Sequence, residues 1–377
     1  MSERVVDIEI DATDGAARTG RVHTPRATFE TPVFMPVGTR GSVRTLSSQD
    51  LDDLGVEIML GNTYHLMLRP GADLIAEMGG LHRFMAWDHH VLTDSGGFQI
   101  FSLEPKVRDE GAIFTSTYDG SRHHLTPETA VDVQRALGAD IQMVLDVCPP
   151  LPSSEVVVRQ AVDRTARWAA RARPAFLAGR DAGRTDAERS QAQFGIVQGG
   201  VDEALRRESV ERTIDVGFDG YGIGGLSVGE PREQMLPALE VVTALLPPDQ
   251  PRYLMGVGDP IGLIEGIARG VDMFDCVMPT RAARHGTVLT DAGRLNLRNA
   301  EHARSDLPLD PSCACSTCAR FSRAYLRHVL RVGEPTAARL LTIHNVHWSL
   351  GLMQRARAAI RAGQLGALTA EIRTAWD

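Results

Sequence analysis

The sequence predicts an α/β protein built on a (β/α)8 TIM barrel, with an inserted hairpin and a further subdomain near the C-terminus. Eight short apolar runs each end in a polar or glycine-rich turn, and helical patterns fall between most of them. Repeated alternation of this kind is typical of a closed parallel barrel. A doubly wound open sheet is the alternative, but no G-x-G-x-x-G or Walker pattern follows the first run. The barrel is therefore favoured.

The expected strands and helices follow one another along most of the chain. The strands are Pro32–Val37, Glu57–Gly61, His90–Asp94, Ile141–Asp146, Phe194–Gln198, Gly220–Gly224, Tyr253–Val257 and Val271–Cys276. The helices between them are Ser47–Leu54, Thr126–Leu137, Glu155–Ala172, Ala204–Val216, Pro231–Leu246 and Ile261–Gly270. The helix start at Thr126 is well marked, because a capping hydroxyl is followed by a proline and an acid.

Clustered cysteines near the C-terminus predict a structural metal site. The expected ligands are Cys313, Cys315, Cys318 and His344. The cysteines follow a C-x-C-x2-C spacing, and the histidine lies 26 residues after the last of them. Three sulfurs and one imidazole complete a tetrahedral set for Zn2+ and leave no position open for water, so the ion is expected to stabilise the fold. His347 and His328 are alternative fourth ligands.

Two segments are too long to be simple connections between a strand and a helix. The interval from Gln99 to Leu125 is expected to hold an inserted hairpin that turns at Asp119-Gly120. The second insertion follows the eighth strand and contains the cysteines. We therefore expect a barrel with the catalytic centre in residues 1–290, a zinc-binding insertion in 291–345, and a C-terminal helical segment that closes the barrel in 346–377.

Composition and charge narrow the class of protein. No run approaches eighteen consecutive apolar residues, and the first residues lack the apolar core of a signal peptide, so no membrane association is expected. Five cysteines, three of them in a metal pattern, suit the cytoplasm. The net charge is −8, but residues 281–377 carry +7, which leaves −15 on the first 280. This basic quarter either attracts phosphate or solvates amphipathic helices.

Polar or flexible residues stand at the ends of most expected strands. They are Asn62, Asp94, Asp146, Gln198, Gly224-Gly225, Met255 and Asp275. In a barrel of this kind, residues at the carboxyl ends of the strands face one mouth. A single carboxylate there is more often a helix cap or a turn residue, whereas three that face one mouth indicate a catalytic site.

The chemistry of these groups suits a planar heterocycle that carries an amide. Asp146 can accept two parallel N–H bonds, as the N1–H and 2-amino edge of guanine would provide, and Gln198 adds a donor and an acceptor. Phe98 follows two glycines and offers a flat face for stacking, although Asp94–Gln99 could also be a capped turn.

Two carboxylates also support a double displacement at a glycosidic carbon. One attacks the carbon, and the other handles the proton of the leaving group. Asp275 emerges from an apolar run and is followed by Arg281 and Arg284, which could hold a phosphate beside a ribose attacked by that carboxylate.

With these motifs the chain resembles the bacterial tRNA-guanine transglycosylases (queuine tRNA-ribosyltransferases) from about Thr24 to the last helix. The matching motifs are Gly61–Leu66, Asp94–Gln99, Gly195–Gly199, Gly224–Glu230, Tyr253–Gly258, Phe274–Arg281 and the cysteine cluster. The resemblance implies that guanine at position 34 of tRNAs with a G34-U35 anticodon is exchanged for the 7-deazaguanine base preQ1, in queuosine biosynthesis. It also implies a homodimer.

The resemblance further implies a role for each site residue. Asp275 would be the nucleophile that bonds to the ribose C1′, Asp94 the general acid/base, and Asn62 a support for the nucleophile and the ribose. The implied base contacts are Asp146, Gln198, the backbone of Gly225 and Leu226, and a sandwich of Phe98 and Met255. Val228, which replaces the glycine of eukaryotic chains, narrows the pocket and favours preQ1. Val147 departs from the glutamate of many bacterial members.

Two other functions remain open at this point. One is a retaining glycoside hydrolase, which would use the same carboxylates on a sugar but would need stacking tryptophans, and none of the four lies in a strand-end motif. The other is a non-catalytic tRNA-binding accessory subunit, and retention of both Asp94 and Asp275 argues against it.

Overall fold

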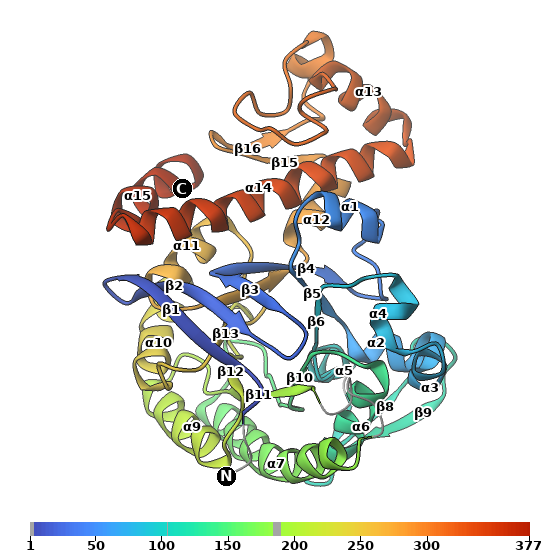
Figure 1. Ribbon diagram of the computed structural model, residues 1–377, viewed down its shortest axis with the longest axis vertical. Helices are drawn as coiled ribbons and strands as arrows, with labels where there is room; N and C mark the ends of the chain where they lie inside the picture. Colours follow the sequence, from blue (N-terminus) through green and yellow to red (C-terminus); the bar gives the residue numbers. More distant parts are fainter. Residues whose placement is uncertain (1–3, 104, 184–189) are drawn as a thin grey trace.

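The computed structural model describes residues 4–103, 105–183 and 190–377. Eight parallel strands close into a barrel, in which the last strand pairs with the first (Figure 1). They are β4 (Val33–Gly38), β5 (Ile58–Gly61), β6 (His90–Thr93), β10 (Ile141–Met143), β11 (Ala192–Val197), β12 (Gly220–Ile223), β13 (Arg252–Leu254) and β14 (Met273–Cys276). Each overlaps one of the eight apolar runs, so the predicted barrel is confirmed.

Helices cover the outside of the barrel between successive strands. The predicted ones are α1 (Ser48–Asp53), α6 (Pro127–Leu137), α7 (Glu155–Asp181), α9 (Glu203–Val216), α10 (Arg232–Leu245) and α11 (Pro260–Ala268). Short helices also follow β5 and β6: α2 (Thr63–Leu66), η1 (Met67–Gly71), α3 (Ala72–Glu77), α4 (Gly80–Met85) and α5 (Gly97–Phe101). The prediction that α7 ends at Ala172 is wrong. Burial of Phe176 and the Arg173–Asp219 ion pair, at 2.9 Å, stabilise the helix beyond Pro174.

An antiparallel sheet at the N-terminus covers one end of the barrel. It consists of β1 (Asp7–Asp14), β2 (Ala17–His23) and β3 (Thr28–Thr31). Val22 and Phe29 pack into the barrel core, and the Arg18 guanidinium bonds to both carboxylate oxygens of Asp272, just before β14. Because these contacts lie at the amino ends of the barrel strands, the carboxyl ends are left for the functional site.

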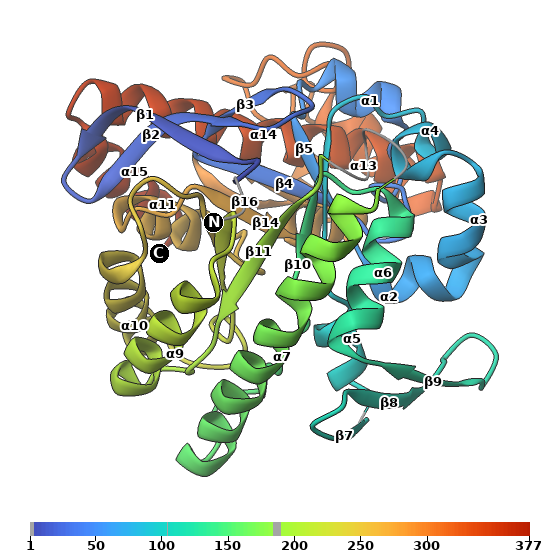
Figure 2. The same cartoon turned by 60° about the horizontal axis from the view of Figure 1, so that its bottom comes forward.

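The predicted hairpin insertion is present after β6. Strands β8 (Ala112–Thr115) and β9 (Arg122–Leu125) pair antiparallel, and the short strand β7 (Lys106–Val107) pairs with β8 as the third strand of the sheet. Figure 2 shows this sheet projecting from the barrel beside α5. Its turn, residues 116–121, includes the expected Asp119-Gly120.

The C-terminal region forms a lobe beside the barrel and a long helix that joins the two. The elements are α12 (Met278–Arg284), β15 (Thr287–Thr290), β16 (Gly293–Asn296), η2 (Ala300–Arg304), α13 (Arg323–Val332), α14 (Pro335–Arg361) and α15 (Leu365–Trp376). Leu340 and Leu341 of α14 pack with the lobe, whereas Leu352 and Met353 pack with the barrel (Figure 1). Helix α14 therefore runs unbroken through positions 345 and 346. Within the described residues, no helix has the length and apolar character needed to cross a bilayer.

Candidate active site

A cavity of about 470 Å³ opens at the carboxyl ends of the barrel strands. Asp94 after β6, Asp146 after β10 and Asp275 in β14 all line it, although at least 52 residues separate any two of them in the chain. The three carboxylates differ in how many hydrogen bonds they receive, and this difference indicates what each can do.

Asp94 receives four hydrogen bonds from described residues. The Asn62 and Gln99 side-chain amides donate to Oδ2 at 2.6 and 2.9 Å, and the backbone N–H groups of Thr63 and Gly96 donate to Oδ1 at 2.8 and 3.2 Å. Burial raises the pKa of Asp94, and these donors oppose the rise. The carboxylate is thus held firmly, in an environment that also favours holding a proton.

Asp275 is bound through one oxygen only. The Tyr253 hydroxyl and the Gly256 N–H donate to Oδ1 at 2.6 and 2.7 Å, and no described residue donates to Oδ2. Burial raises the pKa of Asp275, and the charge of Asp94 adds to this effect. An oriented carboxylate with one free, desolvated oxygen at the cavity wall is suited to act as a nucleophile.

Asp146 faces the cavity between Gln198 and Gly97. The Gln198 side-chain amide donates to Oδ2 at 2.6 Å. Burial raises the pKa of Asp146 to about 6. A Cβ atom at Gly97 would come within 3.1 Å of Oδ1, so a glycine at this position keeps that oxygen accessible to a ligand.

Arg206 fixes the backbone on the side of the cavity formed by β11 and β12. Its fully buried guanidinium donates to the carbonyl groups of Val197, Gly200, Gly224 and Gly225 at 2.7–3.1 Å. Burial lowers its pKa to about 10, so it remains charged at neutral pH. The arginine thereby fixes the turns that follow β11 and β12, and Gly224 and Gly225 of the second turn line the cavity.

The next turn, 225–230, is held in an unusual conformation. Gly225 has φ +63°, and a Cβ there would lie 2.2 Å from Oε1 of Gln198, so only glycine fits. Ser227 also has a positive φ of 60°. The Glu230 carboxylate accepts from the N–H groups of Ser227 and Val228, which offsets the strain of the turn.

The structure brings most of the predicted site residues to this cavity. Those that line it are Asn62, Asp94, Phe98, Asp146, Gly225, Leu226, Met255, Asp275 and Arg281. Gln198 contacts the cavity through Asp146. Arg284 lies one helical turn beyond Arg281 in α12. Asn62 bonds to Asp94, whereas the resemblance implies support of Asp275, which Tyr253 and Gly256 provide instead.

The predicted metal ligands converge in the C-terminal lobe. The donor atoms of Cys313, Cys315, Cys318 and His344 lie within 4.8 Å of one another, close to the edge of about 3.8 Å expected for a tetrahedron with 2.3 Å metal–sulfur bonds. His344 Nε2 contacts the Leu289 carbonyl at 2.7 Å, which leaves Nδ1 facing the sulfurs. The group can hold a metal ion, and neither His347 nor His328 belongs to it.

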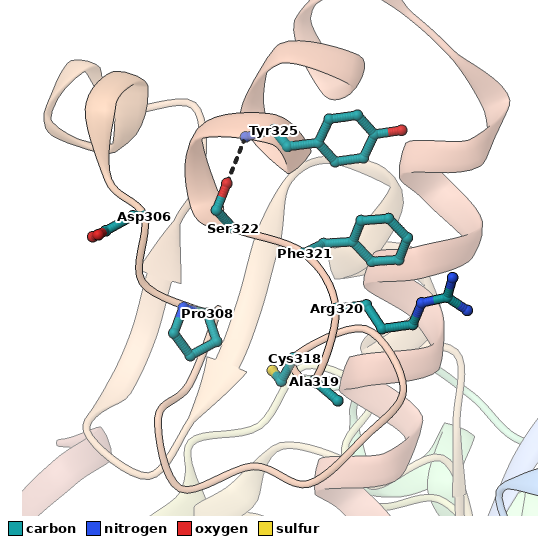
Figure 3. A pocket seen from close by; sticks show the side chains of 8 residues that line it. All are labelled: Asp306, Pro308, Cys318, Ala319, Arg320, Phe321, Ser322 and Tyr325. Carbon is teal, nitrogen blue, oxygen red and sulfur yellow. Dashed lines mark hydrogen bonds between the residues drawn. The ribbon is translucent and has the colours of Figure 1, made fainter.

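A shallow hollow lies on the surface beside this cluster. Phe321 and Tyr325 stack with ring centroids 5.3 Å apart and form one side of it, and Pro308 lies on the other (Figure 3). The Tyr325 side chain is 43% exposed even though its ring is apolar. The hollow contains none of the carboxylates of the barrel cavity.

Comparison with known proteins finds one family that matches nearly the whole chain. The family model described as queuine tRNA-ribosyltransferase matches residues 12–377. A queuine tRNA-ribosyltransferase of Desulforudis audaxviator is 58% identical over 91% of each chain. That of Symbiobacterium thermophilum is 55% identical over 92% of this chain and 85% of its own, and that of Bacillus velezensis is 50% identical over 97% and 95%.

Proposed function

The chain belongs to the queuine tRNA-ribosyltransferase family, which carries out tRNA-guanine transglycosylation in queuosine synthesis, and we propose that it does so by double displacement at Asp275. The observation that carries this proposal is the unequal bonding of the carboxylates. Asp275 keeps one oxygen free, whereas Asp94 has both oxygens occupied.

In the first half of the reaction, Oδ2 of Asp275 attacks the ribose C1′ of nucleotide 34. The bond from C1′ to N9 of guanine breaks, and its electron pair stays on N9, which takes a proton from Asp94. In the second half, the incoming base gives its N9 proton to Asp94 and attacks C1′, so that Asp275 leaves as a carboxylate. Both carboxyl groups therefore end in the state in which they began.

Gln99 offers a way for Asp94 to carry its proton. Oε1 of Gln99 is buried and has no hydrogen-bond partner within the described part of the chain, while its amide nitrogen donates to Asp94. Rotation of the Gln99 side-chain amide, which exchanges the positions of its oxygen and nitrogen, would present Oε1 as an acceptor to protonated Asp94. The same side chain can thus stabilise either protonation state.

The base would be recognised by groups that follow β10 to β13, the first of which pairs with β6. Asp146 lines the cavity and accepts from the Gln198 amide through Oδ2, so Oδ1 would accept from the N1–H and 2-amino edge of a guanine-like ring, with the Gly225–Leu226 backbone also at the cavity. Phe98, at 63% exposure, and Met255 would enclose the two faces of the ring. Val228 also lines the cavity and limits its width, which favours preQ1 over a bulkier base.

We assign Zn2+ as the ion of the four-ligand cluster. Three thiolates and an imidazole are the donors that zinc prefers, and four protein ligands leave no site for a reacting water. The ion would tie the 313–318 knuckle to α14 at His344 and so stabilise the lobe. The proposed organisation is a barrel in 1–290, a zinc-binding insertion in 291–345 and a closing helical segment in 346–377, with α14 shared by the last two.

The partners proposed are a tRNA with a G34-U35 anticodon, preQ1 and a second copy of the chain, in the cytoplasm. The stack of half-buried Phe321 and exposed Tyr325 is an apolar surface that a second copy would cover. The basic arginines Arg281 and Arg284 on α12 would contact phosphate groups of the tRNA.

A base-exchange assay tests the proposed function. Labelled guanine, preQ1 and queuine are each offered with an anticodon stem-loop, and incorporation into RNA is measured. Guanine and preQ1 should be incorporated and queuine should not. If the protein were a retaining hydrolase, the RNA would lose guanine without gaining a base. If it were an accessory subunit, it would bind RNA without any exchange.

A further inference from the structure

We propose that Arg40, Arg69 and Tyr118 form a phosphate-binding site at the rim of the cavity, which holds the RNA backbone beside the reacting nucleotide. This inference rests on the proposed function, since the ligand is taken to be RNA. None of these three residues belongs to the predicted site, and they come from three separate segments that follow β4, β5 and β6.

Tyr118, in the turn of the inserted hairpin, is the centre of the arrangement. The guanidinium carbon of Arg40 lies 5.3 Å from the ring centroid, and that of Arg69 lies 5.0 Å from it. His65 Nδ1 contacts the Tyr118 hydroxyl at 2.8 Å and fixes the ring in place. One aromatic ring thus gathers two guanidinium groups that would otherwise repel each other.

These two charges are not neutralised by any acidic residue that the structure describes. Arg40 and Arg69 are both exposed, and no carboxylate among the described residues pairs with either. Many other exposed arginines do have such a partner, as in the Arg212–Asp163 pair at 2.7 Å. Burial, followed by the charge of Arg40, lowers the pKa of His65, so the histidine adds no charge at neutral pH. An anion would relieve the repulsion, and phosphate matches the planar donors of guanidinium.

The loop after β4 extends this site toward the other predicted tRNA contacts. Arg40 stands at one end of the loop and Arg44 at the other. Burial lowers the pKa of Arg284, and the nearby charges of Arg44 and Arg281 lower it further. Thr45 holds a positive φ of 76°, and its hydroxyl bonds to Thr342 in α14 at 3.1 Å. The loop is therefore anchored in one shape.

The order of the strands in the barrel places the basic residues side by side along one half of the rim. The neighbours β14, β4, β5 and β6 carry, in that order, the segments with Arg281 and Arg284, with Arg40 and Arg44, with Arg69, and with Tyr118. The proposed base-recognition groups follow β10, β11, β12 and β13 on the other half of the barrel, apart from Phe98, which follows β6. A nucleotide could therefore point its base toward one half while its flanking phosphates lie along the other.

The test measures binding of a fluorescent anticodon stem-loop by anisotropy over a salt series. Arg40→Ala, Arg69→Ala and Tyr118→Ala should each weaken binding by roughly fivefold, and each arginine variant should reduce the salt dependence by about 0.7 in log–log slope per lost phosphate contact. Arg69→Lys should fall between wild type and Arg69→Ala, because it keeps the charge and loses the planar contact.

Arg83→Ala is the matched control. Arg83 is exposed and unpaired within the described residues, but it lies in α4, which leads into the amino end of β6. The proposal is overturned if the three rim variants bind like Arg83→Ala, or if Arg40→Ala and Arg69→Ala lose affinity with no change in slope. Since binding is measured apart from exchange, absence of base exchange in wild type would count against the proposed function only.

Discussion

The Tyr253 hydroxyl donates a hydrogen bond of 2.6 Å to Oδ1 of Asp275 and leaves Oδ2 free. Burial and the nearby charge of Asp275 raise the pKa of Tyr253 well above its ordinary value, so the phenol remains a donor throughout the usual pH range. This contact joins neighbouring strands of the barrel and orients the proposed nucleophile.

Removing this donor should slow the reaction and move its pH dependence. In Tyr253→Phe the ionised form of Asp275 loses a charged hydrogen bond, so the pKa of Asp275 should rise and the acid limb of the rate profile should shift to higher pH. We expect a rate about 10-fold lower near pH 7. Single-turnover exchange across pH 5–9 measures both effects. Tyr325→Phe is the control, and a profile equal to wild type would refute the role.

Asp94→Asn should abolish exchange and also lower stability. The new amide must turn its NH2 toward one pair of the four donors that now face the carboxylate, which leaves buried polar groups unsatisfied. The expected loss of stability is about 1–3 kcal/mol. Urea denaturation measures it, with the exposed Asp215→Asn as the control. A variant that is as stable as wild type would mean that these donors do not depend on the charge of Asp94.

Asp146 makes stability and base binding depend on pH in opposite ways. Its pKa in the folded protein, about 6, lies above the ordinary value of 3.8 for an aspartate, so the folded state binds more protons between these values and stability falls as pH rises. Asp146→Asn should therefore gain roughly 2–3 kcal/mol at pH 8 and nothing near pH 3.5. Thermal melts at the two pH values test this.

In wild type, base binding should weaken below about pH 6, because a protonated Asp146 cannot accept two N–H bonds. Asp146→Asn should lose base binding at every pH, since its amide replaces an acceptor with a donor. A KM for the base that stays constant between pH 5 and 8 in wild type would contradict this assignment.

Removal of the metal should destabilise the C-terminal lobe before it reduces base exchange in the barrel. Cys315→Ser should lower the zinc content from one ion per chain toward none and reduce the melting temperature of the lobe, because the ion joins the knuckle to α14. Metal analysis and calorimetry test this. Cys148→Ser, in the barrel cavity, is the control and should keep its zinc. A wild-type protein purified without any metal would contradict the zinc assignment.

The barrel is predictable because its strands are buried on both faces. All six residues of β4 and all six of β11 are buried, so these strands appear in the sequence as short apolar runs between turns. The N-terminal sheet lies outside the prediction, although Asp7–Asp11 alternates polar and apolar residues as a half-buried strand does. Its role as a cover for the barrel depends on contacts with distant strand ends.

The hydrogen-bond partners of the carboxylates are harder to predict from the sequence. Tyr253 pairs with Met273 in the adjacent strand, so its ring reaches Asp275, two residues further along the same face. This register is set by closure of the barrel and not by any local motif. The same holds for Arg206, whose four carbonyl acceptors come from two separate turns.

The most direct measurement is the site of the RNA–protein bond. Protein is mixed with an anticodon stem-loop without free base, denatured and digested, and the peptides are analysed by mass spectrometry. The mechanism predicts an adduct on Asp275 that lacks guanine and is missing from Asp275→Asn. An adduct mapped to Asp94 or to any other side chain, or exchange that proceeds at the wild-type rate in Asp275→Asn, would contradict it.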